Sequence, residues 1–151
     1  MMMNQNWVIK AFNELAPNEL YAILRLRSEV FVVEQNCVFL DMDNKDQQCH
    51  HLMGIQDGKL VAYTRLAPPG HIYEQPSIGR VVTAPEVRNS GIGKILMKQS
   101  INGIIQLYGS QPIKIGAQLY LKKFYESFGF QQISDVYLED GIEHIYMLKT
   151  N

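Results

Sequence analysis

Apolar residues along this chain follow two different spacings, and each spacing predicts a different kind of element. Short apolar runs bounded by polar or glycine-containing turns are typical of strands. The runs of this kind are residues 7–11, 51–56, 60–66, 77–83, 112–117, 130–137 and 142–149. Asp57-Gly58 separates the second run from the third, and Glu139-Asp140-Gly141 separates the last two, so each of these pairs is predicted to form a hairpin.

Three other segments place apolar residues three and four positions apart, which is the spacing of the buried face of a helix. They are residues 17–31, 91–108 and 119–128, and Gly129 after the third is a natural helix end. Residues 36–48 are polar and irregular, and they are predicted to form a loop that covers a site.

This order of elements predicts an α/β (α+β) fold in which helices flank a mixed, mainly antiparallel sheet of about six to seven strands. The length of 151 residues suits a single domain spanning 1–151. An exposed edge of such a sheet can pair with a second copy, so a homodimer is compatible with the sequence.

The composition excludes several classes of protein. With 46% hydrophobic and 19% charged residues and a net charge of -1, the chain offers nothing that attracts nucleic acid or an anionic membrane. No apolar run reaches the roughly 20 residues that a membrane span needs, and the N-terminus lacks the pattern of a signal peptide. Cys37 and Cys49 make no disulfide framework, so a cytoplasmic location is expected.

A glycine-containing turn before the helix at 91–108 is the strongest chemical signal. It reads Arg88, Asn89, Ser90, Gly91, Ile92, Gly93 and Lys94. The first N–H groups of a helix lack backbone partners, and the helix dipole favours an anion at this end, so such a turn suits phosphate. Arg88 adds a charged donor, and the glycines allow close approach of the ligand. An ordinary loop with two glycines is the alternative interpretation.

The spacing of this turn excludes the commoner phosphate loops, because no Ser or Thr follows Lys94 and Leu96 stands where a dinucleotide fingerprint has its third glycine. Instead, Arg-x-x-Gly-x-Gly resembles the acetyl-CoA pyrophosphate loop of the GNAT N-acetyltransferases. The segment Tyr125 to Phe130, Tyr-x-x-x-Gly-Phe, is similar to the last motif of the same superfamily. Two motifs in the right order identify this superfamily more specifically than either motif alone.

Other segments resemble the ElaA-type branch of that superfamily. They are residues 27–37, Asp41-x-Asp43, the run His50-His51-Leu52, and residues 137–144. This resemblance concerns the fold and the cofactor more than the acceptor.

The resemblance implies a role for particular positions. Backbone N–H groups of Val81, Val82 and Thr83 would hold the pantetheine arm and polarise the thioester, and the turn from Arg88 to Lys94 would cradle the pyrophosphate. Gln118 stands where many relatives have an asparagine that binds the pantetheine arm. The alternative interpretation is that Gln118 is only a polar residue at the end of a strand and has no contact with a cofactor.

Tyr125 is predicted to be the general acid at the departing thiolate. The alternative is an aromatic residue packed on the buried face of a helix, which periodicity alone favours.

The sequence leaves the general base open, because the expected strand at 112–116 carries no carboxylate where many relatives have one. The available groups are Glu34, Asp43, His50, His51, Glu139 and His144. They suggest an acceptor pocket built by the first helix, its following loop and the closing hairpin, and the acids in it would suit a cationic amine.

No metal is expected from the sequence. The spacing of Cys37, Cys49, His50 and His51 matches no zinc pattern. The aspartates at 41, 43 and 46 do not match a calcium loop.

These features together predict an enzyme that transfers an acetyl group from acetyl-CoA to a primary amine of a small molecule or peptide, by direct attack in a ternary complex. Two alternatives stay open: a non-catalytic acyl-CoA-binding or regulatory module, and a protein that binds a nucleotide through the same turn.

Overall fold

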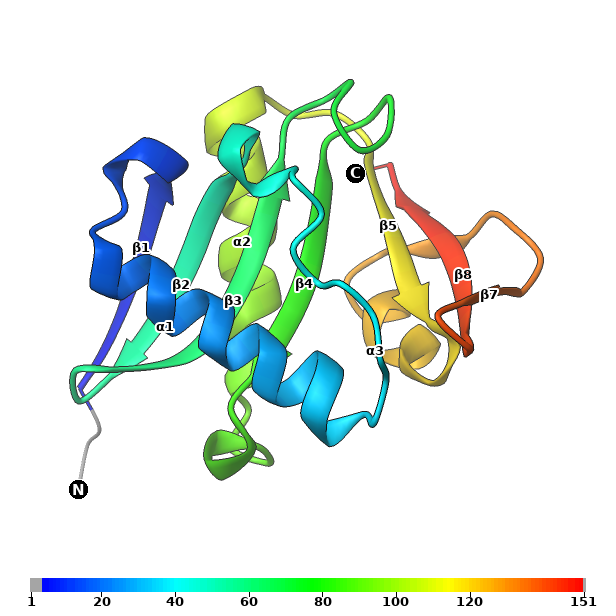
Figure 1. Cartoon of the computed structure of the whole chain (residues 1–151). Helices are drawn as coiled ribbons and strands as arrows, with labels where there is room; N and C mark the ends of the chain where they lie inside the picture. Colours follow the sequence, from blue (N-terminus) through cyan, green and yellow to red (C-terminus); the bar gives the residue numbers. More distant parts are fainter. Residues whose placement is uncertain (1–3, 151) are drawn as a thin grey trace.

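Two antiparallel sheets and three α-helices make up the part of the chain that the computed structural model describes, residues 4–150. The first sheet has the order β1-β2-β3-β4. The second has the order β5-β8-β6, and β7 also pairs with β8 (Figure 1). In chain order the elements are β1 Gln5–Ala11, α1 Pro17–Arg27, β2 His50–Gln56, β3 Lys59–Ala67, β4 Ser77–Thr83, α2 Ile92–Tyr108, β5 Ile113–Gln118, α3 Lys122–Glu126, β6 Gln131–Gln132, β7 Tyr137–Glu139 and β8 Ile142–Lys149.

Both predicted hairpins are present, and their turns explain why. Asp57 and Gly58 have φ of 51° and 81°, and Asp140 and Gly141 have φ of 50° and 78°. Positive φ at both central residues gives a turn whose twist matches that of the flanking strands, and Asp-Gly adopts this conformation readily. The turns therefore set the register of β2 with β3 and of β7 with β8.

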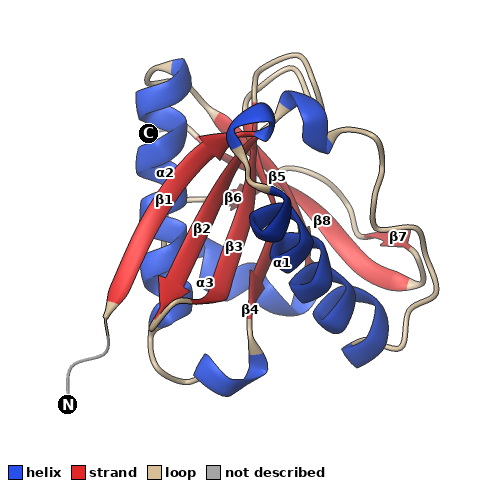
Figure 2. Ribbon diagram, turned by 60° about the vertical axis from the view of Figure 1, so that its left-hand side comes forward, coloured by secondary structure: helices blue, strands red, loops and turns tan. Residues whose placement is uncertain are grey.

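The helices cover opposite faces of the first sheet. Helix α1 lies on one face, whereas α2 lies on the other face, on the same side as α3 (Figures 1 and 2). Gly103 allows α2 to approach the sheet closely, because a Cβ atom there would stand 2.8 Å from Ile9 Cδ1 and 3.0 Å from Leu66 Cδ1. Ile23 of α1 and Leu96 and Ile104 of α2 are fully buried, so the core lies in the layers between sheet and helices.

Strands β4 and β5 run in the same direction but separate along their length (Figure 1). The backbone N–H of Lys114 donates to Pro76 O at 3.1 Å, where the two strands begin. Beyond that point each strand pairs only with its own sheet, β4 with β3 and β5 with β8. Because the two strands are parallel neighbours, the arrangement is mixed although every paired ladder is antiparallel, which confirms the predicted fold class.

Three predicted elements differ from the structure. The helix predicted at 17–31 is α-helical only to Arg27 and continues as a wider π-helix over Ser28–Glu34. The helix predicted at 119–128 consists of a 3₁₀ turn, Leu119–Leu121, and a short α3. The strand predicted at 130–137 is interrupted, because the Ser134 hydroxyl accepts the backbone N–H of Tyr146 in place of a strand carbonyl. Local periodicity cannot foresee such a replacement.

Candidate active site

A cavity of about 570 Å³ lies where β4 and β5 separate. Its walls come from both strands, from the π-helix that follows α1, from the first turn of α2, from α3, and from the turn between β7 and β8. Because α1 and α2 lie on opposite faces of the sheet (Figure 2), the cavity has two ends. We call the end near α2 and α3, where the turn predicted to hold the cofactor lies, the cofactor end. The end near the π-helix and the β7–β8 turn, where the sequence predicts the acceptor pocket, we call the acceptor end.

The cofactor end begins at the N-terminus of α2. Gly91 caps this helix with φ of 84° and has no side chain that could pair with the first N–H groups. Gly93, two residues further on, lines the cavity. The N–H groups of the first turn are therefore available to an anion, and the helix dipole adds to the attraction.

The side chains of the turn contribute less than the sequence suggests. Ile92 is buried in the core at 3% exposure, so only its backbone faces the turn. The Ser90 hydroxyl donates to Val87 O, and Asn89 has φ of 64°. Asn89, Ser90 and Lys94 are exposed on the outside of the turn rather than in the cavity wall. The structure thus places the anion-binding capacity of the turn mainly on its backbone.

Arg88 lines the cavity but is already paired. Its two terminal nitrogens contact the Glu34 carboxylate at 2.5 and 2.8 Å, and one of them also donates to Thr83 O at 3.3 Å. The bidentate contact lowers the pKa of Glu34 and raises the pKa of Arg88. A phosphate ligand of Arg88 would have to compete with Glu34 or share the guanidinium with it.

Strand β4 carries a β-bulge that the sequence did not reveal. Tyr63 pairs with Val82 and Arg65 pairs with Gly79, so two steps on β3 are matched by three on β4. Arg80, at the extra position, has φ of 50°, which is unusual for a residue with a side chain. A bulge takes one residue out of the ladder and turns the backbone. It lies directly before Val81, Val82 and Thr83, which all line the cavity.

Tyr125 of α3 is both packed among aromatic rings and part of the cavity wall. It lines the cavity, and it is packed edge-on against Phe124 and Phe130 with only 5% of its surface exposed. Burial raises the pKa of its hydroxyl well above the usual value for tyrosine. The hydroxyl therefore stays protonated at neutral pH and is available as a donor, so its role as general acid stays a prediction.

Gln118 ends β5 and lines the cavity. Its side-chain amide forms two long hydrogen bonds with the amide of Gln35, at 3.4 and 3.5 Å. Gln35 follows the π-helix, so this amide pair bridges the cavity between β5 and the α1 side.

The structure separates the candidate bases into two groups. Glu34, Glu139 and His144 line the cavity. Asp43, His50 and His51 do not: the buried His51 ring contacts the Tyr63 hydroxyl at 2.6 Å and Asp46 O at 2.9 Å, and His50 Nδ1 lies 3.3 Å from the Tyr108 hydroxyl.

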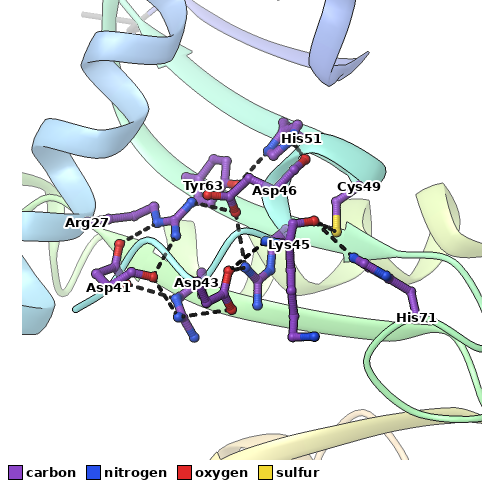
Figure 3. Close-up of polar contacts among 11 residues, drawn as sticks. Arg27, Asp41, Asp43, Lys45, Asp46, Cys49, His51, Tyr63 and His71 are labelled. Atoms are coloured by element: carbon purple, nitrogen blue, oxygen red, sulfur yellow. Dashed lines mark hydrogen bonds and ion pairs between the residues drawn. The ribbon is translucent and has the colours of Figure 1, made fainter. Parts of the chain in front are cut away.

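Asp43 belongs to a buried ionic network that sequence reasoning missed (Figure 3). Three aspartates of the 36–48 loop meet three arginines, Arg27 from α1, Arg65 from β3 and Arg80 from the β4 bulge. The ion pairs include Arg27–Asp41, Arg27–Asp46, Arg65–Asp43, Arg65–Asp46, Arg80–Asp41 and Arg80–Asp43. The one signal in the sequence was an arginine at position 27 within an otherwise apolar helical stripe.

The network fixes the loop predicted to cover a site. Arg27 is fully buried, and Asp41 and Asp46 are each 6% exposed. The ion pairs that anchor the loop are therefore buried rather than exposed to solvent. Further along the loop, the Cys37 thiol donates to Asp140 O at 3.3 Å and ties the loop to the β7–β8 turn. Cys37 and Phe39 line the cavity, so the loop forms part of the acceptor end.

Comparison with protein families matches residues 21–151 to the family described as an acetyltransferase (GNAT) domain. Among curated proteins, the chain is 44% identical over 148 residues to a UPF0039 protein of Schizosaccharomyces pombe, with 97% of each chain covered. It is 39% identical over 145 residues to protein ElaA of Escherichia coli, with 95% of each chain covered.

Solved structures agree with these relatives. An acyl-CoA N-acyltransferase from Pseudomonas aeruginosa matches with a TM-score of 0.93 and 40% identity, over 97% of this chain and 100% of that chain. The crystal structure of E. coli ElaA matches with a TM-score of 0.90 and 37% identity, over 98% and 99% of the two chains.

The fold is that of an acyl-CoA N-acyltransferase. More particularly, the chain belongs to the GNAT acetyltransferase family and, through its likeness to ElaA, to the ElaA-type branch. The predicted family is thereby confirmed. The residues present fit an acyl-CoA: the bare helix N-terminus capped by Gly91 suits its phosphates, and the gap between β4 and β5 suits an extended arm.

Within residues 4–150, no group of three or more His, Cys, Asp or Glu side chains is arranged to hold a metal ion. In the same range, no helix is both long and apolar enough to cross a membrane.

Proposed function

We propose that the protein transfers an acetyl group from acetyl-CoA to a primary amine by direct attack, with both substrates bound together. The observation that carries this proposal is the cavity between β4 and β5, which has an anion-binding helix terminus at one end and acid–base side chains at the other. Such a cavity lets the two substrates meet from opposite faces of the sheet.

At the cofactor end, the backbone of Gly91 to Lys94 binds the pyrophosphate and Arg88 adds a charged contact. Backbone N–H groups of Val81 to Thr83 bind the pantetheine arm and polarise the thioester carbonyl, and the bulge at Arg80 turns them toward the cavity. Gln118 supplies an amide from the facing strand.

Tyr125 donates its proton to the departing thiolate in this proposal. Its support is the position of a buried, protonated hydroxyl in the cavity wall. The surrounding Phe124 and Phe130 rings hold the tyrosine ring and exclude water from it.

Calorimetric titration with acetyl-CoA, repeated with ATP, tests the first half of the proposal. Binding of acetyl-CoA in the micromolar range without comparable binding of ATP is the expected result. Thiol release from acetyl-CoA is then measured with a panel of primary amines: benzylamine, tyramine, spermidine and lysine ethyl ester. Tight binding with no amine-dependent thiol release would favour the non-catalytic acyl-CoA-binding module, and preferential binding of ATP would favour the nucleotide-binding alternative.

A further inference from the structure

His144 is the one histidine among those described that lines the cavity. It lies on β8 directly opposite Gln118 of β5. Residues directly opposite each other in an antiparallel pair place their side chains on the same face of the sheet. His144 therefore faces the cavity beside Gln118, at the acceptor end.

The hydrogen bond of one ring nitrogen fixes the state of the other. His144 Nδ1 lies 2.7 Å from the backbone oxygen of Ile142, which can only accept a hydrogen bond. Nδ1 therefore carries the proton in the neutral ring, and Nε2 carries the lone pair. Stacking of the ring on Tyr137, with centroids 5.8 Å apart, holds this orientation.

Glu139 stands beside the free nitrogen. Its Oε2 lies 3.6 Å from His144 Nε2, too far for a direct hydrogen bond. The two atoms are both acceptors when the ring is neutral, so together they form a place for a group with several N–H donors and a positive charge. A primary ammonium has three such donors.

His144 is largely buried, whereas Glu139 is exposed to solvent. The His144 side chain is 10% exposed, whereas that of Glu139 is 60% exposed. Tyr137 of β7 stacks on the ring, and Gln118 of β5 lies opposite His144 in the ladder. Because Glu139 is exposed, a proton taken up by Nε2 can leave to bulk water on the side of that carboxylate.

We infer that Glu139 and His144 receive the ammonium group of the acceptor, and that His144 Nε2 removes the proton that the amine must lose before it attacks. This inference rests on the acetyl transfer proposed above and assigns its acceptor class, a primary amine that is cationic at neutral pH. It also explains how the enzyme works without a carboxylate on β5, which reads Ile113–Gln118.

The step balances. The ammonium gives one proton to Nε2 and becomes a neutral amine, and the imidazolium then releases that proton to water at the exposed side of the site. The nitrogen lone pair then forms the bond to the acetyl carbon, the carbon–sulfur bond breaks, and the second proton lost by the nitrogen is matched by the proton that the thiolate gains. Each turnover releases one proton to solvent.

Two probe amines separate proton removal from other effects of a substitution. Benzylamine is an ammonium at neutral pH and aniline is neutral there, so only the first needs a base before attack. We expect His144→Gln to lower kcat/KM for benzylamine roughly 100-fold, the usual scale for loss of a general base, and to lower kcat/KM for aniline far less. Glu139→Gln should chiefly raise KM for benzylamine. The control is Glu143→Gln, an exposed position of the same hairpin, which should leave kcat and KM for benzylamine unchanged.

A readout independent of turnover follows from the ring itself. The chain has four histidines, so the His144 ring signals in an NMR spectrum are assigned by their absence from His144→Gln. Benzylammonium should shift the His144 signals in wild type and shift them much less in Glu139→Gln, whereas the neutral analogue benzyl alcohol should not reproduce the shift.

The outcomes are distinct. Equal loss of benzylamine and aniline transfer in His144→Gln, or an unchanged rate with both, overturns the role of His144 while leaving acetyl transfer in place. Absence of transfer from wild type to every amine of the panel overturns the proposed function, and this inference with it.

Discussion

The two ends of the cavity are built in different ways. The cofactor end is made mostly of backbone: the first turn of α2 after Gly91 and the bulged edge of β4. The acceptor end is made of side chains from segments far apart in the chain, among them Glu34, Cys37, Glu139 and His144. A ligand common to a whole family can be held by main-chain groups that depend little on side-chain identity, whereas an acceptor that differs between enzymes needs side chains.

The two ends also differ in what holds them in place. The cofactor end follows from a local turn and a regular helix. The acceptor end depends on the 36–48 loop, whose aspartates are anchored to the buried Arg27 and Arg65 and to the partly exposed Arg80. Substitutions should therefore affect the two ends separately, and the following predictions run from the largest expected effect to the smallest.

Removal of a shared anchor should give the largest effect. Asp46 contacts both Arg27 and Arg65, at 2.9 and 3.0 Å. Asp46→Ala leaves two buried arginines short of a partner, so the free energy of unfolding should fall by about 3–5 kcal/mol. Urea unfolding measures this, and Asp135→Ala, at an exposed position, is the matched control. A loss no larger than that of the control would mean that the network does not hold the loop.

The same network predicts a dependence of stability on pH. Burial alone would raise the pKa of Asp46, but Arg27 and Arg65 outweigh it, so the pKa lies below its usual value, and the same holds for Asp43 beside Arg65 and Arg80. A lowered folded-state pKa gives stability that is present above the unfolded pKa, about 3.9, and is lost as pH falls through the folded value. Wild type should therefore lose stability in acid more steeply than Asp46→Ala, as urea midpoints across this range would reveal.

Gly91→Val tests the cofactor end. Gly91 has φ of 84°, which a β-branched residue avoids, and a side chain there would also meet an approaching phosphate. Affinity for acetyl-CoA, measured by calorimetry, should fall about 100-fold, or about 2.7 kcal/mol. Gly109→Val places backbone strain at the other end of α2, where φ of 87° and ψ of 171° suit only glycine, and should destabilise the protein without weakening binding. Equal affinities in the two variants would remove the turn from the site.

Tyr125→Phe tests the proposed proton donor. Turnover should fall about 10-fold or more while the affinity for acetyl-CoA changes little, because only the proton donor is lost and the ring packing is kept. Steady-state kinetics with an accepted amine and calorimetry give the two quantities. Tyr21→Phe, an exposed tyrosine of α1, is the control. Full turnover in Tyr125→Phe would leave the residue only its packing role.

Glu34→Gln should give the smallest effect, because the Glu34–Arg88 pair is partly exposed and such pairs contribute about 1 kcal/mol or less. Release of Arg88 from its bidentate partner should raise the affinity for acetyl-CoA by about 2- to 5-fold. The control is Glu86→Gln, which breaks another surface ion pair, that with Lys59. A lowered affinity would instead mean that Glu34 holds Arg88 in its binding position.

Local features of the sequence predicted the local features of the structure. The Asp-Gly turns, the long helix α2 and the glycine-containing turn before it were all predicted from a few neighbouring residues. Interruption of the strand at Ser134 was not predicted, because it depends on a contact with Tyr146 of another strand. Widening of α1 into a π-helix was not predicted either, because the apolar spacing of residues 17–31 is that of an ordinary α-helix.

The same division holds within the site. The backbone donors at Gly91 follow from the sequence, since a glycine cap before an amphipathic stripe specifies a helix end by itself. The pairing of Arg88 with Glu34 and the bulge at Arg80 follow only from contacts between separate segments. A histidine or an arginine in the sequence has no defined role until its neighbours in space are known.

By itself, therefore, the sequence determined the family, the order of elements and the end of the cavity that depends on local backbone conformation. Tertiary structure decided which of the six candidate acid–base residues face the cavity, and why Asp43 and His51 do not: burial of an ion or a ring nitrogen requires partners, and those partners come from other strands and helices. Local propensity fixes φ and ψ over a few residues, but the environment of a charge is fixed only when the whole chain has packed around it.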